Sequence, residues 1–181
     1  MAVDARTLTL QRPRSLKAAL AMLAKEPTLT PIAGCTDVLV GLHFGTTDRQ
    51  HFIDLWGLDE LRGITVDKPS RSHRAVLRIG ALSTFTEIIA SPLVRSRVPM
   101  LVAAAREVGG RQIQNRGTLG GNIANASPAG DTLPVLLALD AEIVVGGRRG
   151  ERVIPAAAFW VAYRQSALAP DELVLRVRIP V

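Results

Sequence analysis

Two short segments of the chain place glycine directly before small polar side chains, a pattern that suits the binding of an anion. They are Ala33-Gly34-Cys35-Thr36-Asp37 and Thr118-Leu119-Gly120-Gly121-Asn122. Glycine lets a backbone come close to a ligand, and successive backbone amides in a glycine-bearing turn form an anion-binding concavity. If both segments bind one ligand, that ligand should be long and should carry a pyrophosphate. The alternative is that both are ordinary turns, since glycine occurs in most loops.

Polar side chains continue beyond the second segment, at Asn125 and Asp131. Asp131 could cap the helix that follows, a role worth about 1 kcal/mol. It could also accept hydrogen bonds from ligand hydroxyls, each worth roughly 1.5 to 3 kcal/mol, and the two roles are compatible. Asn122 and Asn125 have two interpretations as well, ligand binding or hydrogen bonding to their own backbone, which is the commoner use of Asn in loops.

Other kinds of chemistry lack their usual patterns. Neither glycine segment is a P-loop or a G-x-G-x-x-G turn, so nucleoside-triphosphate hydrolysis and a Rossmann fold are disfavoured. The three histidines are scattered and the chain has one cysteine, so we predict no zinc or iron–sulfur site. Cys35 has no partner histidine that the sequence identifies. We therefore predict no catalytic residue and no metal site.

Composition limits the fold and the compartment. With 181 residues and 48% apolar composition, the chain suits one domain or two lobes that share a core. It has neither a signal peptide nor a run of about 18 apolar residues, so we expect a cytoplasmic protein without a membrane partner. The net charge of +6 raises nucleic acid as a partner, but the arginines are scattered along the chain, so we expect none.

Periodicity and capping residues predict a mixture of helices and strands. The expected helices run from Ser15 to before Pro27, over 36–44 with Thr36 as cap, from Thr84 through 90 with a Thr84–Glu87 capping box, over 99–108, and over 133–139 capped by Asp131 or Thr132. The expected strands are 30–33, 51–55, 63–67 paired with 75–80 across the turn 68–74, 142–145 paired with 152–154, and 173–179. No regular strand–helix repeat occurs, which indicates an α+β fold.

Residues 116–141, R-G-T-L-G-G-N-I-A-N-A-S-P-A-G-D-T-L-P-V-L-L-A-L-D-A, resemble the signature of a flavoprotein family. This is the FAD-binding (medium) subunit or domain of molybdenum hydroxylases, the xanthine dehydrogenase, carbon monoxide dehydrogenase and aldehyde oxidase group. Residues 31–39, 79–84 and 159–180 resemble further segments of the same family. The resemblance implies the two-lobed FAD-binding fold of the vanillyl-alcohol-oxidase (PCMH) type, with a small N-terminal lobe over 1–55 and a larger α+β lobe over 56–181.

The resemblance also implies which residues bind FAD. Those that would bind the pyrophosphate through backbone amides are Ile32, Ala33, Gly34, Cys35, Thr36, Asp37, Val38, Gly120, Gly121 and Asn122. Those that would bind the ribityl chain, nearby phosphate oxygens, the flavin or the adenine are Thr118, Asn125, Asp131, Val108 and Val174. Cys35 replaces the family's usual second glycine, which requires a negative φ or backbone strain there. Thr36 stands where relatives with covalent FAD carry histidine, so non-covalent FAD is expected.

The function that the resemblance implies is electron transfer. The chain would be an oxidoreductase component that passes electrons from iron–sulfur clusters through FAD to NAD or another acceptor. Its partners would be a molybdopterin-containing large subunit and a [2Fe-2S] small subunit, and a homo-oligomer is left open. The alternatives are an assembly module that no longer holds FAD firmly and a stand-alone flavin reductase or oxidase. Family members continue for roughly a hundred residues into a C-terminal domain, so we expect a fragment or a short homologue that lacks it.

Overall fold

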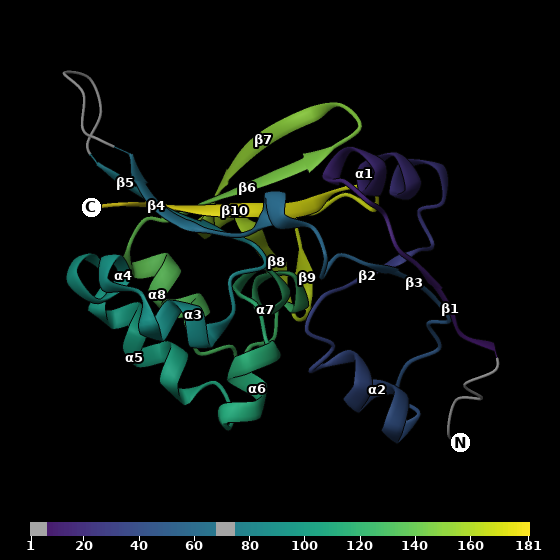
Figure 1. Ribbon diagram of the computed structural model, residues 1–181, viewed down its shortest axis with the longest axis horizontal. Coiled ribbons are helices and arrows are strands. Elements are labelled where there is room, and N and C mark those ends of the chain that lie inside the picture. The colour runs from purple at the N-terminus through teal and green to yellow at the C-terminus, as the bar shows by residue number, and fades with distance from the viewer. Residues whose placement is uncertain (1–6, 68–74) are drawn as a thin grey trace.

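Two sheets organise the computed structural model, which describes residues 7–67 and 75–181 (Figure 1). The larger is a five-stranded antiparallel sheet in the order β4-β5-β10-β6-β7, with strands Ile64–Asp67, Val76–Gly80, Leu173–Pro180, Glu142–Gly147 and Gly150–Pro155. The smaller is a three-stranded parallel sheet in the order β1-β3-β2, with strands Thr9–Gln11, His51–Asp54 and Thr30–Ile32. A short hairpin pairs β8 (Trp160–Ala162) with β9 (Gln165–Ser166).

Helices cover one face of the larger sheet. Figure 1 shows this layer below the sheet, and its helices are α3 (Phe85–Ala90), α4 (Pro92–Arg97), α5 (Pro99–Glu107) and α8 (Thr132–Ala138). Because side chains alternate across a strand, one row of the central strands is apolar and joins Phe85 and Leu101 in the main core, to which β7 adds Ile154. The other row carries charges, and Arg176 and Arg178 pair there with Glu151 and Glu142.

A second core joins the two sheets. Helix α1 (Leu16–Lys25) packs Ala19 and Leu23 against Ile53 of β3, and the same cluster includes Leu175 of β10. Strand β10 also contributes Val177 to the main core. It can supply both clusters because its register against β6 shifts between Val174 and Arg176. One strand therefore fixes the smaller sheet relative to the larger.

Most predicted elements are present, and the best-defined ones begin at caps. The Ser15 side chain accepts a hydrogen bond from the Ala18 amide at the start of α1, and Thr84 and Glu87 form the expected capping box of α3. The cap of α2 (Val38–Phe44) is different, because Asp37 and not Thr36 holds the N-cap position, and it makes no side-chain cap bond. The prediction for Thr36 was wrong. The predicted turn 68–74 lies outside the described residues.

Several short helices were not predicted. They are η2 (Asp59–Leu61), α4, α6 (Arg111–Arg116), α7 (Leu119–Asn125) and α9 (Ala156–Phe159). The second glycine segment, read as a loop, is in fact the first turn of α7. Two consecutive glycines weaken helix propensity, but here the Thr118 side chain caps the helix and tertiary packing stabilises it. Among the described residues, no helix has the length and apolar character needed to cross a bilayer.

Candidate functional site

Gly34 of the first predicted segment touches Arg116 and Gly117, the two residues just before the second segment. Gly34 is buried, and a Cβ built on it would lie 1.8 Å from the carbonyl oxygen of Arg116 and 2.5 Å from its carbonyl carbon. Any other amino acid would overlap the backbone there, since real Cβ atoms do not approach to such distances. Glycine is therefore needed at position 34 for contact between chain segments.

A second contact joins the first segment to the end of α7 through side chains. The Asn125 Nδ2 group donates a hydrogen bond of 3.0 Å to Oδ1 of Asp37. The Arg164 guanidinium, in the turn between β8 and β9, donates one of 3.4 Å to Oδ1 of Asn125. The start of α2, the end of α7 and the β8–β9 turn thus meet, and two of the predicted ligand-binding residues, Asp37 and Asn125, lie side by side.

The loop from Gly34 to Val38 presents unpaired amides. Its carbonyls at Cys35 and Asp37 accept hydrogen bonds from Leu39 and Gly41. Within residues 7–67 and 75–181, however, no acceptor bonds the amides of Gly34 to Val38. The sequence required either a negative φ or backbone strain at Cys35. Its φ is +62°, in the left-handed region, so the backbone is strained there. Unpaired amides in a partly exposed loop suit an anionic ligand.

The amides of the second segment are already bonded. The Gly120 amide donates to the Ala81 carbonyl at 2.8 Å, and the Asn122 amide to the Thr118 carbonyl at 3.0 Å. The Gly121 amide donates to Oγ1 of Thr118, which is 3% exposed. A Cβ on Gly120 would lie 2.7 Å from that of Ala81, so packing accounts for this glycine. A phosphate would compete with these bonds, whereas the first loop offers it free donors.

The polar side chains that follow have distinct roles. The Asn122 Oδ1 atom accepts a 2.6 Å hydrogen bond from the fully buried Thr132 hydroxyl. Asp131 is exposed and occupies the N-cap position of α8, yet its side chain makes no cap bond. Its φ of −57° and ψ of −32° are helical, whereas a capping residue normally adopts extended angles. Asp131 therefore holds the predicted N-cap position but lacks the side-chain cap bond, and its carboxylate stays available to a ligand.

The four remaining predicted residues, Ile32, Ala33, Val108 and Val174, lie in different parts of the molecule. Ile32 ends β2 and is half-buried, and Ala33 packs against the second core, so both lead into the Gly34 loop. Val108 packs at the edge of the main core and Val174 is buried within it.

Cys35 is a poor nucleophile in this setting. Burial raises the pKa of its thiol, the Asp54 carboxylate raises that pKa further, and the Arg116 guanidinium lowers it. The balance favours the neutral thiol at neutral pH, and only the thiolate is nucleophilic. This agrees with the absence of a predicted catalytic role for Cys35.

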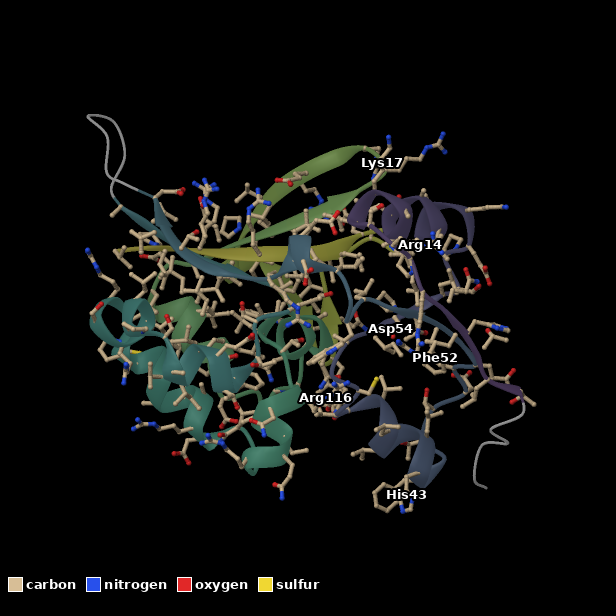
Figure 2. All side chains as sticks on the ribbon, viewed as in Figure 1. Arg14, Lys17, His43, Phe52, Asp54 and Arg116 are labelled. Atoms are coloured by element: carbon tan, nitrogen blue, oxygen red, sulfur yellow. The ribbon has the colours of Figure 1, made fainter. Side chains whose placement is uncertain are left out.

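Two residues at this contact were not singled out by the sequence. The Arg116 guanidinium carbon lies 3.8 Å from the ring centroid of Trp56, which follows β3, and that of Arg62 lies 4.7 Å from it. Figure 2 shows Arg116 between the α6–α7 segment and α2, with Asp54 beyond it at the end of β3. The only sequence signal was the position of Arg116 immediately before G-T-L-G-G.

The sequence has matches among dehydrogenase subunits. Residues 6–181 match the family described as the FAD binding domain in molybdopterin dehydrogenase. The chain is 35% identical over 169 residues to the xanthine dehydrogenase FAD-binding subunit of Escherichia coli O157:H7, which covers 93% of this chain and 56% of that protein. It is 31% identical over 169 residues to the carbon monoxide dehydrogenase medium chain of Hydrogenophaga pseudoflava, with 93% and 57% covered.

The fold has solved counterparts. A structure of carbon monoxide dehydrogenase from Hydrogenophaga pseudoflava matches with a TM-score of 0.89 and 30% sequence identity, over 96% of this chain and 58% of that chain. The chain therefore spans a little more than half the length of these three relatives.

Gly34→Ala tests the close contact between the segments. The added methyl group meets the Arg116 carbonyl, so the segments have to separate. We expect urea denaturation to show a free energy of unfolding lower by about 1 to 3 kcal/mol, as for other overpacked sites. Gly57→Ala is the matched control, because a Cβ there meets no atom within 4 Å. Equal losses in the two variants would contradict the contact.

Cys35→Gly tests the strain at the left-handed position. An L residue there costs roughly 1 to 2 kcal/mol, and the greater unfolded-state entropy of glycine offsets about 0.4 to 1 kcal/mol. We therefore expect the free energy of unfolding to rise by about 0.5 to 1 kcal/mol. Gly45→Ala, at a φ of +63°, should change it in the opposite direction. A destabilised Cys35→Gly protein would mean that contacts of the thiol outweigh the strain.

Proposed function

Because the chain belongs to the family of FAD-binding domains of molybdopterin dehydrogenases, we propose that it is the electron-transfer component of a molybdenum hydroxylase-type oxidoreductase. The family inferred from residues 116–141 is thereby confirmed, and so is FAD as its cofactor. The predicted α+β FAD-binding fold is confirmed by the carbon monoxide dehydrogenase structure.

The observation that carries the proposal is the loop from Gly34 to Val38, with unpaired amides, held against the Arg116 backbone. In our proposal these amides bind the pyrophosphate of FAD. Ile32 and Ala33 position the loop, and Gly120 lets α7 pack closely against Ala81, while Gly121 donates its amide to the Thr118 cap. This fits the ligand, because a diphosphate needs several donors in one place.

The second segment supplies side chains to the same ligand. The Asp131 carboxylate and the Asn125 amide are proposed to hydrogen-bond the ribityl hydroxyls or nearby phosphate oxygens. Thr118 and Asn122 hold α7 and α8 in place through their bonds to Gly121 and Thr132. Val108 beside the flavin or ribityl portion and Val174 near the adenine remain part of the proposal.

Bound FAD supplies the redox chemistry through its isoalloxazine ring. The chain itself binds and orients the cofactor. As proposed partners, a molybdopterin-containing subunit and a [2Fe-2S] subunit deliver electrons, and NAD or another acceptor removes them. We also propose lobes over 1–55 and 56–181, between which Ile53 and Leu175 share the second core.

Reconstitution tests the proposal directly. The purified chain, incubated with excess FAD and separated from free flavin by gel filtration, should retain visible flavin absorbance. Denaturation should release all of that flavin, because the binding is non-covalent. A chain that retains no flavin at saturating FAD would instead support the assembly-module alternative. Steady NADH oxidation by the isolated, FAD-loaded chain would support a stand-alone flavin reductase.

Asp131→Ala should weaken FAD binding without unfolding the protein. Its side chain makes no cap bond, so the thermal midpoint should hardly change. Loss of a hydrogen bond to a charged acceptor is worth roughly 1.5 to 3 kcal/mol, so the Kd for FAD should rise about 10- to 100-fold. Asp48→Ala, which removes the same charge from an exposed loop, is the control. Unchanged affinity in Asp131→Ala would remove Asp131 from the site.

A further inference from the structure

Arg116 is held in one orientation by an aromatic ring. Its guanidinium carbon lies 3.8 Å from the Trp56 ring centroid, a distance at which cation–π attraction is effective. The Trp56 amide is in turn fixed by a 2.9 Å hydrogen bond to Oδ1 of Asp54 at the end of β3. Stacking occupies the face of the guanidinium and leaves its edge, where the N–H groups point, open to other partners.

A second arginine at the same ring, Arg62, has a structural role, because backbone carbonyls accept hydrogen bonds from its guanidinium. Arg62 lies 4.7 Å from the Trp56 centroid, and its two terminal nitrogens donate to the carbonyls of Leu82 and Trp56, at 3.2 and 2.8 Å. Arg116 differs. In the part of the chain that the structure describes, no carboxylate or carbonyl accepts a hydrogen bond from its guanidinium. Its donors are therefore oriented but unpaired.

These donors lie beside the loop with unpaired amides. The Arg116 carbonyl touches Gly34, and its positive charge acts on the Cys35 thiol. The nearby carboxylates already have partners, since Asp37 accepts from Asn125 and Asp54 pairs with Arg12 at 3.3 Å. The guanidinium therefore lies near the loop amides, and neither makes a hydrogen bond to a carboxylate among the described residues. Arginine matches phosphate geometry well, because its planar fork can donate two parallel hydrogen bonds.

We propose that Arg116 is a binding residue for the diphosphate of FAD, and that Trp56 is the positioning residue that holds its guanidinium toward the Gly34 loop. This rests on the proposed function and extends it, because neither side chain was among the residues expected to contact the cofactor. Arg116 adds a charge-assisted bond where the loop alone offers neutral amides. It also makes binding sensitive to salt, because an exposed ion pair is screened by added ions.

The test is FAD titration of the full chain, followed by flavin fluorescence at low and high salt. In Arg116→Gln, the Kd at low salt should rise about 10- to 100-fold, and the salt dependence should flatten. The Kd of Arg116→Lys should lie between those of the unchanged chain and Arg116→Gln. Lysine keeps the charge but loses the planar fork and the stacking on Trp56. Arg95→Gln, which removes an exposed charge from α4, should bind as the unchanged chain does.

Trp56→Leu tests the positioning role through a double-mutant cycle. It should weaken FAD binding in the presence of Arg116 but add little to Arg116→Gln. Equal, additive losses in the two backgrounds would mean a merely structural role for the ring. Circular dichroism and thermal melting establish that each variant is folded.

The two proposals fail in different ways. If the unchanged chain binds no FAD, the proposed function is wrong and the role of Arg116 falls with it. If the unchanged chain binds FAD and Arg116→Gln binds it equally well, with the same salt dependence, only the inference about Arg116 is overturned.

Discussion

Gly34 lies against the carbonyl group of Arg116 at a distance that only glycine permits, and this contact joins two parts of the chain that are far apart in sequence. It brings the loop before α2 to the junction of α6 and α7. The stacking of Arg116 on Trp56 lies at this junction, and the hydrogen bond between Asp37 and Asn125 joins the same loop to the other end of α7. Loop amides, a carboxamide and a guanidinium are thereby gathered on segments with very different sequence positions.

The junction is supported by packing on both sides. Helix α7 is fixed by the Thr118 cap and by the approach of Gly120 to Ala81, and the loop before α2 continues a strand of the smaller sheet. Strand β10 contributes to both hydrophobic cores, so it limits movement between the two sheets. A ligand that spans the junction therefore meets a largely preformed surface, and less ordering has to accompany its binding.

Sequence reasoning succeeded where the deciding interactions are local. Ser15, Thr84 and Glu87 bond to amides within three residues, so the starts of α1 and α3 could be predicted. It failed for α7, because consecutive glycines disfavour a helix that tertiary contacts stabilise. The proximity of Gly34 to Arg116 has no periodic signal, and only the family resemblance placed those segments on one ligand. The stacking on Trp56 was missed for the same reason.

Strand β10 has a further consequence, for the order in which the chain folds. It is the central strand of the larger sheet, between β5 and β6, and it follows both of them in sequence. Its partner β5 precedes all the helices of the covering layer, so their pairing closes a long stretch of chain. Non-local pairing of this kind slows folding. During synthesis, helices α3 to α8 can form while this edge of β5 is still unpaired, and an unpaired strand edge favours aggregation.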